Sequence, residues 1–135
     1  MSKVDNQTAT MEITRWLDFK KVGEKKREDN QQFIDSLIEA VENGSVTIDE
    51  KNNLVYTLPD PVLSDDDEPV LETLTFKPRI TVKELNSKLK GVKTDDADGR
   101  ILAYVSAITG ENAGTISRMY SEHYAVCTSI VMFFL

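Results

Sequence analysis

The side chains best suited to chemistry in this chain are its single histidine and single cysteine, His123 and Cys127, which stand four positions apart. On a helix this spacing places both side chains on one face, as a thiol nucleophile and an imidazole base require. However, the stretch that carries them is apolar, and no third group is evident to orient the imidazole. We therefore expect an inert, buried thiol, and we predict no catalytic residue and no enzyme.

Metal and cofactor sites are the next possibility, because two runs of carboxylates interrupt the chain. Asp65-Asp66-Asp67-Glu68 lacks the alternating spacing and central glycine of a calcium loop, and Asp95-Asp96-Ala97-Asp98-Gly99 is not followed by the required glutamate. One histidine and one cysteine cannot form a Cys/His metal set. The six glycines are scattered, so they form no phosphate-binding loop. We predict solvated loops, no metal and no cofactor.

Length and charge restrict the class of protein further. A chain of 135 residues fits one small domain with one core. The net charge of −7 argues against a nucleic-acid partner, whose binding depends on Lys and Arg. No apolar run reaches the length of a membrane span, no signal peptide is evident, and a single cysteine suits a reducing cytosol. We therefore predict a cytoplasmic protein that binds neither membrane nor nucleic acid.

The charge is unevenly distributed along the chain. Residues 11–27 contain six basic and three acidic residues, whereas residues 28–135 contain nine basic and nineteen acidic residues. The basic segment is either a solvated tail, an arm that docks on an acidic partner, or an arm that folds back on its own acidic body.

The N-terminal third is predicted to be mainly helical. Residues 1–10 are small and polar, which favours disorder. Ile13, Trp16, Leu17 and Phe19 have helical spacing, and Trp16 and Phe19 are either packed on the body or a candidate partner-binding surface. A second helix is expected from Phe33 to Val41, with Asn43-Gly44 as its stop.

The rest of the chain predicts an α+β fold with a small antiparallel sheet of about three strands, followed by a mainly helical C-terminal half. The strands are expected at 46–48, 54–58 and 70–76, with Pro59 and Pro61 ending the second. A capping box, Thr81 to Glu84, starts a helix that ends near Leu89. Further helices are expected at 100–108, at 115–120 and from 122 onward. Residues 1–45 are interpreted as an N-terminal helical extension, and residues 46–135 as an α+β domain.

The C-terminal block, Ile130-Val131-Met132-Phe133-Phe134-Leu135, is entirely apolar. Each large side chain left in water forfeits about 1.5–3 kcal/mol, so a partner or a second copy is favoured unless the helix passes through the core. Both interpretations remain open. If the block binds a partner, the contact candidates are Met119, Tyr120, Tyr124, Phe133, Phe134 and Leu135.

The order of motifs from about Leu54 to Leu135 resembles the tail assembly chaperones of contractile-tailed bacteriophages, the group that contains the Mu-like tail chaperone. The matching segments are a leucine-rich strand that leads into Phe76-Lys77-Pro78-Arg79-Ile80-Thr81-Val82-Lys83-Glu84-Leu85, and a Gly-Val-Lys loop with aspartates. They continue with Ala107-Ile108-Thr109-Gly110, Ser121-Glu122-His123-Tyr124 and the Phe-Phe-Leu end. Residues 1–45 depart from the pattern.

The resemblance implies a non-enzymatic role in virion morphogenesis. Members of this family are thought to coat the tape measure protein, to bring tail tube subunits to it, and to leave before the tail is finished. The implied location is the host cytoplasm, with absence from the mature virion. The alternative is a structural or scaffold subunit of the phage particle that forms a homo-oligomer through its apolar C-terminal helix.

Overall fold

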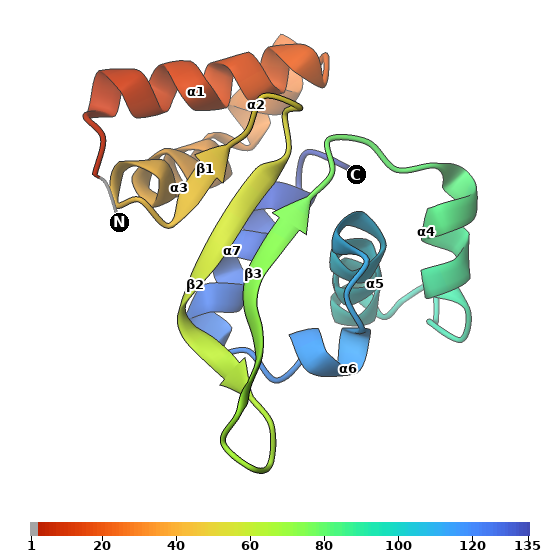
Figure 1. Ribbon diagram of the computed structural model, residues 1–135. Helices are drawn as coiled ribbons and strands as arrows, with labels where there is room; N and C mark the ends of the chain where they lie inside the picture. Colours follow the sequence, from red (N-terminus) through yellow and green to blue (C-terminus); the bar gives the residue numbers. More distant parts are fainter. Residues whose placement is uncertain (1–2) are drawn as a thin grey trace.

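A computed structural model describes residues 3–135 and contains seven helices and three strands over that range. In chain order these are α1 (Asn6–Phe19), α2 (Glu24–Asp29), α3 (Gln31–Glu42), β1 (Val46–Ile48), β2 (Leu54–Leu63), β3 (Pro69–Phe76), α4 (Val82–Leu89), α5 (Ala97–Thr109), α6 (Ala113–Ile116) and α7 (Ser121–Val131) (Figure 1). The predicted α+β class is confirmed. The N-terminal part contains three helices, one more than the upper end of the prediction.

The sheet is antiparallel with the order β1-β2-β3. Val46 pairs with Tyr56, and Leu54 pairs with Phe76. The prediction that Pro59 and Pro61 end the second strand is wrong, because β2 continues to Leu63. The ladder instead shifts its register between Thr57 and Val62, so the two prolines occupy an irregular stretch in which a missing N–H donor interrupts no regular pairing.

Helix α1 begins earlier than expected. The carboxylate of Asp5 accepts a hydrogen bond from the Thr8 amide at 2.7 Å and caps the helix, while the Val4 amide donates to the Glu42 carbonyl at 3.1 Å. The expected disorder of residues 1–10 is therefore wrong for residues 4–10, because a side-chain cap supplies a partner for an orphan helix donor. For residues 1–2 that expectation lies outside the described residues.

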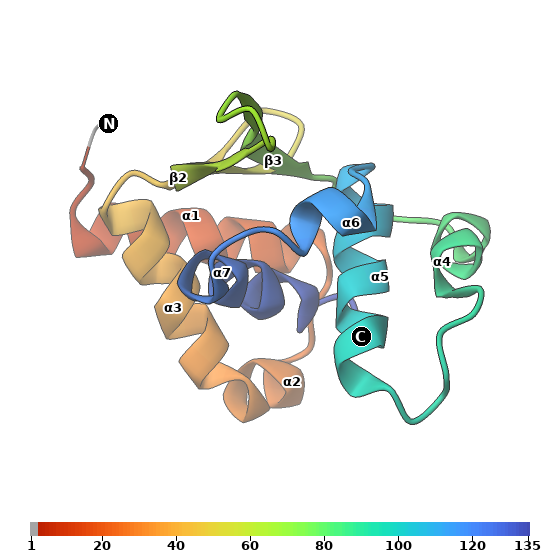
Figure 2. The ribbon, with the colours of Figure 1, turned by 90° about the horizontal axis from the view of Figure 1, so that it is seen from below.

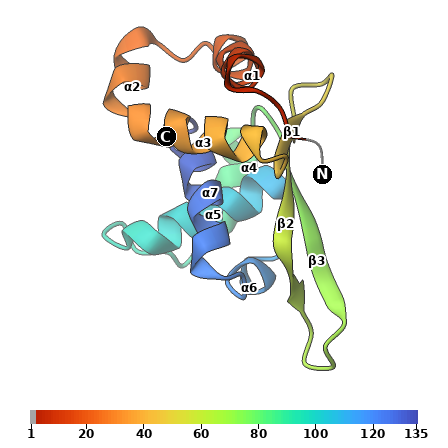
Figure 3. The ribbon, with the colours of Figure 1, turned by 90° about the vertical axis from the view of Figure 1, so that its left-hand side faces the viewer.

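Helix α7 occupies the centre of the molecule. It lies against one face of the β2–β3 hairpin and between α3 and α5, as Figures 2 and 3 show from two directions. Cys127, Ile130 and Val131 are fully buried. The sequence left open whether the C-terminal block is part of the core or a partner surface. Its first two residues, Ile130 and Val131, belong to the core, where the sheet and α3 pack against α7.

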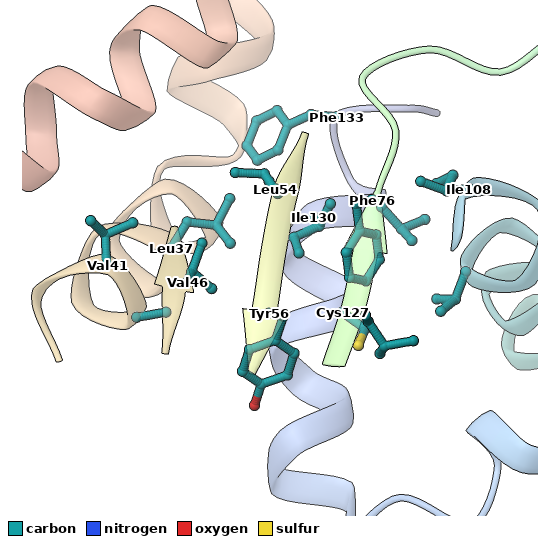
Figure 4. Packing of buried hydrophobic residues seen from close by; sticks show 14 of the residues in the cluster. Leu37, Val41, Val46, Leu54, Tyr56, Phe76, Ile108, Cys127, Ile130 and Phe133 are labelled. Carbon is teal, nitrogen blue, oxygen red and sulfur yellow. The ribbon is translucent and has the colours of Figure 1, made fainter. Parts of the chain in front are cut away.

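One hydrophobic core unites the two parts of the chain that the sequence analysis separated at residue 45. It contains Ile13 and Leu37 from the N-terminal helices, Leu54 and Phe76 from the sheet, and Ile130 from α7. Figure 4 shows side chains from α3, the sheet and the C-terminal part meeting in one cluster, including Leu37, Tyr56, Phe76 and Phe133. The N-terminal helices are therefore part of the same packed unit as the sheet.

Helices α4 and α5 form the outer layer. Thr81 caps α4 as predicted, with its hydroxyl accepting from the Glu84 amide at 3.1 Å. Helix α4 packs on α5 but contains no fully buried residue. Helix α5 starts three residues earlier than expected because the Asp96 side chain caps it through the Gly99 amide.

Candidate partner-binding surface

The structure divides the eight predicted contact residues into two groups at different places. Trp16 from α1 lies against Phe133 and Phe134 in the segment that follows α7, and Phe19 lies beside Arg79. Met119 and Tyr120, from the loop before α7, lie with Tyr124 near the foot of the β2–β3 hairpin. Trp16 is far from the C-terminal block in the sequence, whereas the fold brings the two together.

The first group is mostly core. Trp16 is 0% exposed and Phe133 is 3% exposed, and their rings meet edge to face with centroids 6.1 Å apart at 85°. Phe134 lies tilted against the same indole, with centroids 6.4 Å apart. The indole Nε1 of Trp16 is buried and has no hydrogen-bond partner among residues 3–135. Trp16 and Phe133 are therefore packing residues in this fold and cannot touch a partner.

Three cations surround the edge of this aromatic cluster. The ammonium of Lys20 lies 3.5 Å from the centroid of Phe134 and donates to the Pro78 carbonyl at 2.6 Å. Burial and, to a smaller extent, the nearby charges of Arg79 and Lys26 together lower the pKa of Lys20 from 10.5 to about 8. Lys20 thus joins α1 to the segment after β3 and to the chain end, at a cost in desolvation.

Phe19 and Leu135 are the exposed members of the first group. Phe19 is 38% exposed, and the Arg79 guanidinium covers its ring at 4.8 Å from the centroid. Leu135 is 56% exposed and lines a hollow of about 280 Å³ with residues around the start of α5. These two side chains lie at the rim of a cluster that the protein already fills with its own residues.

The second group lines open surface. A hollow of about 290 Å³, here called the helix hollow, lies between α5, α6 and α7 and is lined by Asp98, Leu102, Ile116, Ser117, Met119, Ser121 and Tyr124. Burial and, to a smaller extent, Cys127 and Asp98 raise the pKa of Tyr124 to about 12. Leu102, Ile116 and Met119 make the lining largely apolar, and Asp98 adds a carboxylate to it.

A second hollow of about 330 Å³, here called the hairpin hollow, adjoins the first. It is lined by Asp60, Pro61, Val62, Leu63, Arg118, Met119 and Tyr120. Met119 lines both hollows, which together are called the groove below. Tyr120 is 61% exposed and Leu63 is 42% exposed. Figures 1 and 3 place the groove elements, α6 and the lower part of the hairpin, beside each other.

The histidine and cysteine do not form a catalytic pair. The imidazole Nε2 of His123 lies 2.9 Å from the Asp60 carboxylate, and this is its only hydrogen bond to residues 3–135. Cys127 is fully buried, and burial raises the pKa of its thiol to about 12. A neutral thiol without access to solvent is a poor nucleophile.

Over residues 3–135, no three His, Cys, Asp or Glu side chains gather closely enough to hold a metal ion. Within the same range, no helix combines the length and apolar character that crossing a bilayer requires. The Asp65 carboxylate instead pairs with Arg118 at 3.5 Å.

Three of the residues that line the groove, Met119, Tyr120 and Tyr124, are contact candidates that the sequence alone suggests. Leu102, Ile116 and the hairpin residues 61–63 join them only through tertiary packing. No local pattern in the sequence marks these residues as neighbours.

Comparison of the chain with protein-family models, with curated proteins and with solved structures gives no match.

Proposed function

We propose that this protein is a phage tail assembly chaperone that binds the tape measure protein, with tail tube subunits as a second partner. It acts in the host cytoplasm during tail morphogenesis and leaves before the virion is complete. The proposal rests on the motif order from Leu54 to Leu135 and on the kind of surface that the described residues present.

The groove is the observation that carries this proposal. A factor that holds a hydrophobic partner in solution needs exposed apolar side chains on an otherwise charged body. Tyr120 and Leu63 are large and substantially exposed, and Met119 lies between the two hollows. The acidic body keeps complexes apart through mutual repulsion.

The alternative, a scaffold that self-associates through its C-terminal helix, has less support. Ile130 and Val131 are 0% exposed because they form the centre of the core. A homo-oligomer that uses this helix would first have to remove it from the sheet and α3. Only Leu135 at the chain end offers a large exposed side chain for such a contact.

Co-expression with the tape measure and tail tube proteins of the same genome tests the proposal. Copurification and size-exclusion chromatography with light scattering are expected to show a complex with the tape measure protein, and mass spectrometry of finished virions is expected to lack this chain. Deletion of residues 130–135 is unsuitable because it removes core residues. A Tyr120→Ser variant is the better test of the groove as the binding surface for the tape measure protein. Met11→Ser is the matched control, because Met11 is 65% exposed on α1.

The result that overturns the proposal is equally concrete. A folded protein that binds neither partner, or one that is found stoichiometrically in purified virions, is not an assembly chaperone. A stable oligomer that remains in the finished particle supports the scaffold alternative instead.

A further inference from the structure

The two hollows of the groove are immediate neighbours because both are lined by Met119. Side chains three or four positions apart on a helix are also immediate neighbours, about 5–6 Å apart at their Cβ atoms. A helix lying along the groove can therefore place one large apolar side chain in each hollow. The unbranched Met119 between the two hollows can adjust to the shape of either side chain.

The surroundings of the groove are strongly acidic. The hairpin stretch 60–72, of which residues 60–63 line the hairpin hollow, contains six carboxylates and no Lys or Arg. At the opposite side, Asp98 forms no ion pair with any residue of the described range 3–135. Arg118 is the one Lys or Arg that lines the hollows, and Asp65 already pairs with it at 3.5 Å.

We infer that the groove binds a basic amphipathic helix, with two large apolar side chains seated in the hollows and Lys or Arg residues facing Asp98 and the acidic hairpin. This inference rests on the proposed function and specifies the segment of the partner that the chaperone recognises. Charge complementarity selects the occupant, since the apolar contacts alone would accept any hydrophobic helix.

A second copy of this chain fits the groove poorly. Residues 28–135 carry nine basic and nineteen acidic residues, so two bodies brought together at their acidic faces repel each other. The basic residues 20–27 lie around α2 and the end of α1. They belong to the same packed unit as the groove and are not a free arm.

The test uses a synthetic probe whose chemistry is fully defined. The probe is an amphipathic helix of about 20 residues with two Leu residues four positions apart and flanking Lys and Arg. Its twin has Glu in place of each Lys and Arg. Fluorescence anisotropy with the full chain is expected to show binding of the basic probe, weakened between about 0.05 M and about 0.5 M salt, and no binding of the acidic twin.

Variants locate the site. Tyr120→Ser and Met119→Ala are each expected to weaken binding of the basic probe about tenfold or more. Asp98→Asn is expected to weaken it about threefold and to reduce the salt dependence. Met11→Ser and Glu50→Gln are the matched controls, because both positions are exposed and lie outside the two hollows. Circular dichroism confirms that each variant is folded.

Several outcomes overturn the inference. Equal binding of the basic and acidic probes would show that charge does not select the occupant. If Tyr120→Ser and Met119→Ala bind the basic probe as tightly as wild type does, the binding site lies elsewhere. A dimer that Tyr120→Ser abolishes assigns the groove to a second copy. If the tape measure protein copurifies with Tyr120→Ser as well as with wild type, the groove inference fails while the proposed function stands. If the probe binds at the groove but the tape measure protein does not, the proposed function fails instead.

Discussion

The rings of Trp16 and Phe133 meet edge to face, so the first helix of the chain and the segment after α7 close one aromatic cluster. Both side chains are almost completely buried. This contact ties the N-terminal helices to the rest of the fold, and it makes the cluster a direct target for stability measurements.

Truncation of Trp16 is expected to be strongly destabilising. Trp16→Ala should lower the free energy of unfolding by about 3–5 kcal/mol, because it removes a fully buried aromatic side chain. Trp16→Phe should cost clearly less, about 0–2 kcal/mol, because the phenyl ring keeps much of the packing while the buried Nε1 that lacks a partner is removed. Urea unfolding followed by circular dichroism measures both values. Equal losses for the two variants would show that a phenyl ring does not restore packing in the cluster.

Lys20 makes stability depend on pH. Its pKa falls from 10.5 to about 8 on folding, so between these values the unfolded chain binds more protons than the folded chain. The free energy of unfolding therefore rises with pH across this window, by about 1–2 kcal/mol after allowance for solvent screening of the partly exposed ammonium. Lys20→Met should remove this rise.

The Lys20 prediction is checked by the difference between wild type and Lys20→Met in urea unfolding at several pH values from 7 to 10. The difference is needed because other groups act in the opposite direction. Burial raises the pKa of Cys127, Tyr56 and Tyr124, so these groups remain protonated in the fold and lower its stability as pH rises past their unfolded values. A difference that is independent of pH would show that Lys20 remains fully protonated in the fold.

Cys127 should be inert in the native protein. Reaction with a disulfide reagent at about pH 8 is expected to be roughly a thousandfold slower than in the urea-unfolded chain, because the thiol is buried and protonated. The control is a Cys127→Ala, Asp66→Cys double variant, whose new thiol lies in the exposed hairpin turn and should react at once. Rapid labelling of native Cys127 would contradict the buried position of α7.

Helix α4 should be the least stable of the longer helices. It contains no fully buried residue, whereas α7 contains several, so its amides should exchange with solvent much faster in hydrogen-exchange mass spectrometry. Thr81→Ala, which removes the cap, should accelerate exchange in α4 roughly fivefold, equivalent to about 1 kcal/mol. Thr94→Ala, in the exposed loop before α5, should have no such effect. Protection of α4 equal to that of α7 would show that it belongs to the core.

Local patterns in the sequence were sufficient for most elements of the fold. The helix expected at Phe33–Val41, the Thr81 cap and the strand expected at 70–76 each depend on near neighbours in the chain, and each lies where it was expected. The continuation of β2 through Pro59 and Pro61 was not predictable in this way, because a register shift depends on the partner strand. The α1 start was missed since Asp5 was not considered as a cap.

The candidate site was less predictable than the fold. The apolar character of residues 130–135 fits a core helix and a partner surface equally well, and only the position of the sheet and α3 decides between them. The groove depends on Leu102, Ile116 and Leu63, which come from three different elements. Their proximity to Met119 is a property of the packed structure alone.

The central position of α7 has a consequence for synthesis on the ribosome. The sheet is complete once Phe76 has emerged, but the helix that covers its apolar face includes Cys127 and Ile130 and is made much later. At translation rates of about 5–20 residues per second, the nascent sheet waits roughly 3–10 seconds for its cover. During that interval Leu54, Leu74 and Phe76 are exposed to other nascent chains, so early misassociation is the characteristic hazard for this topology.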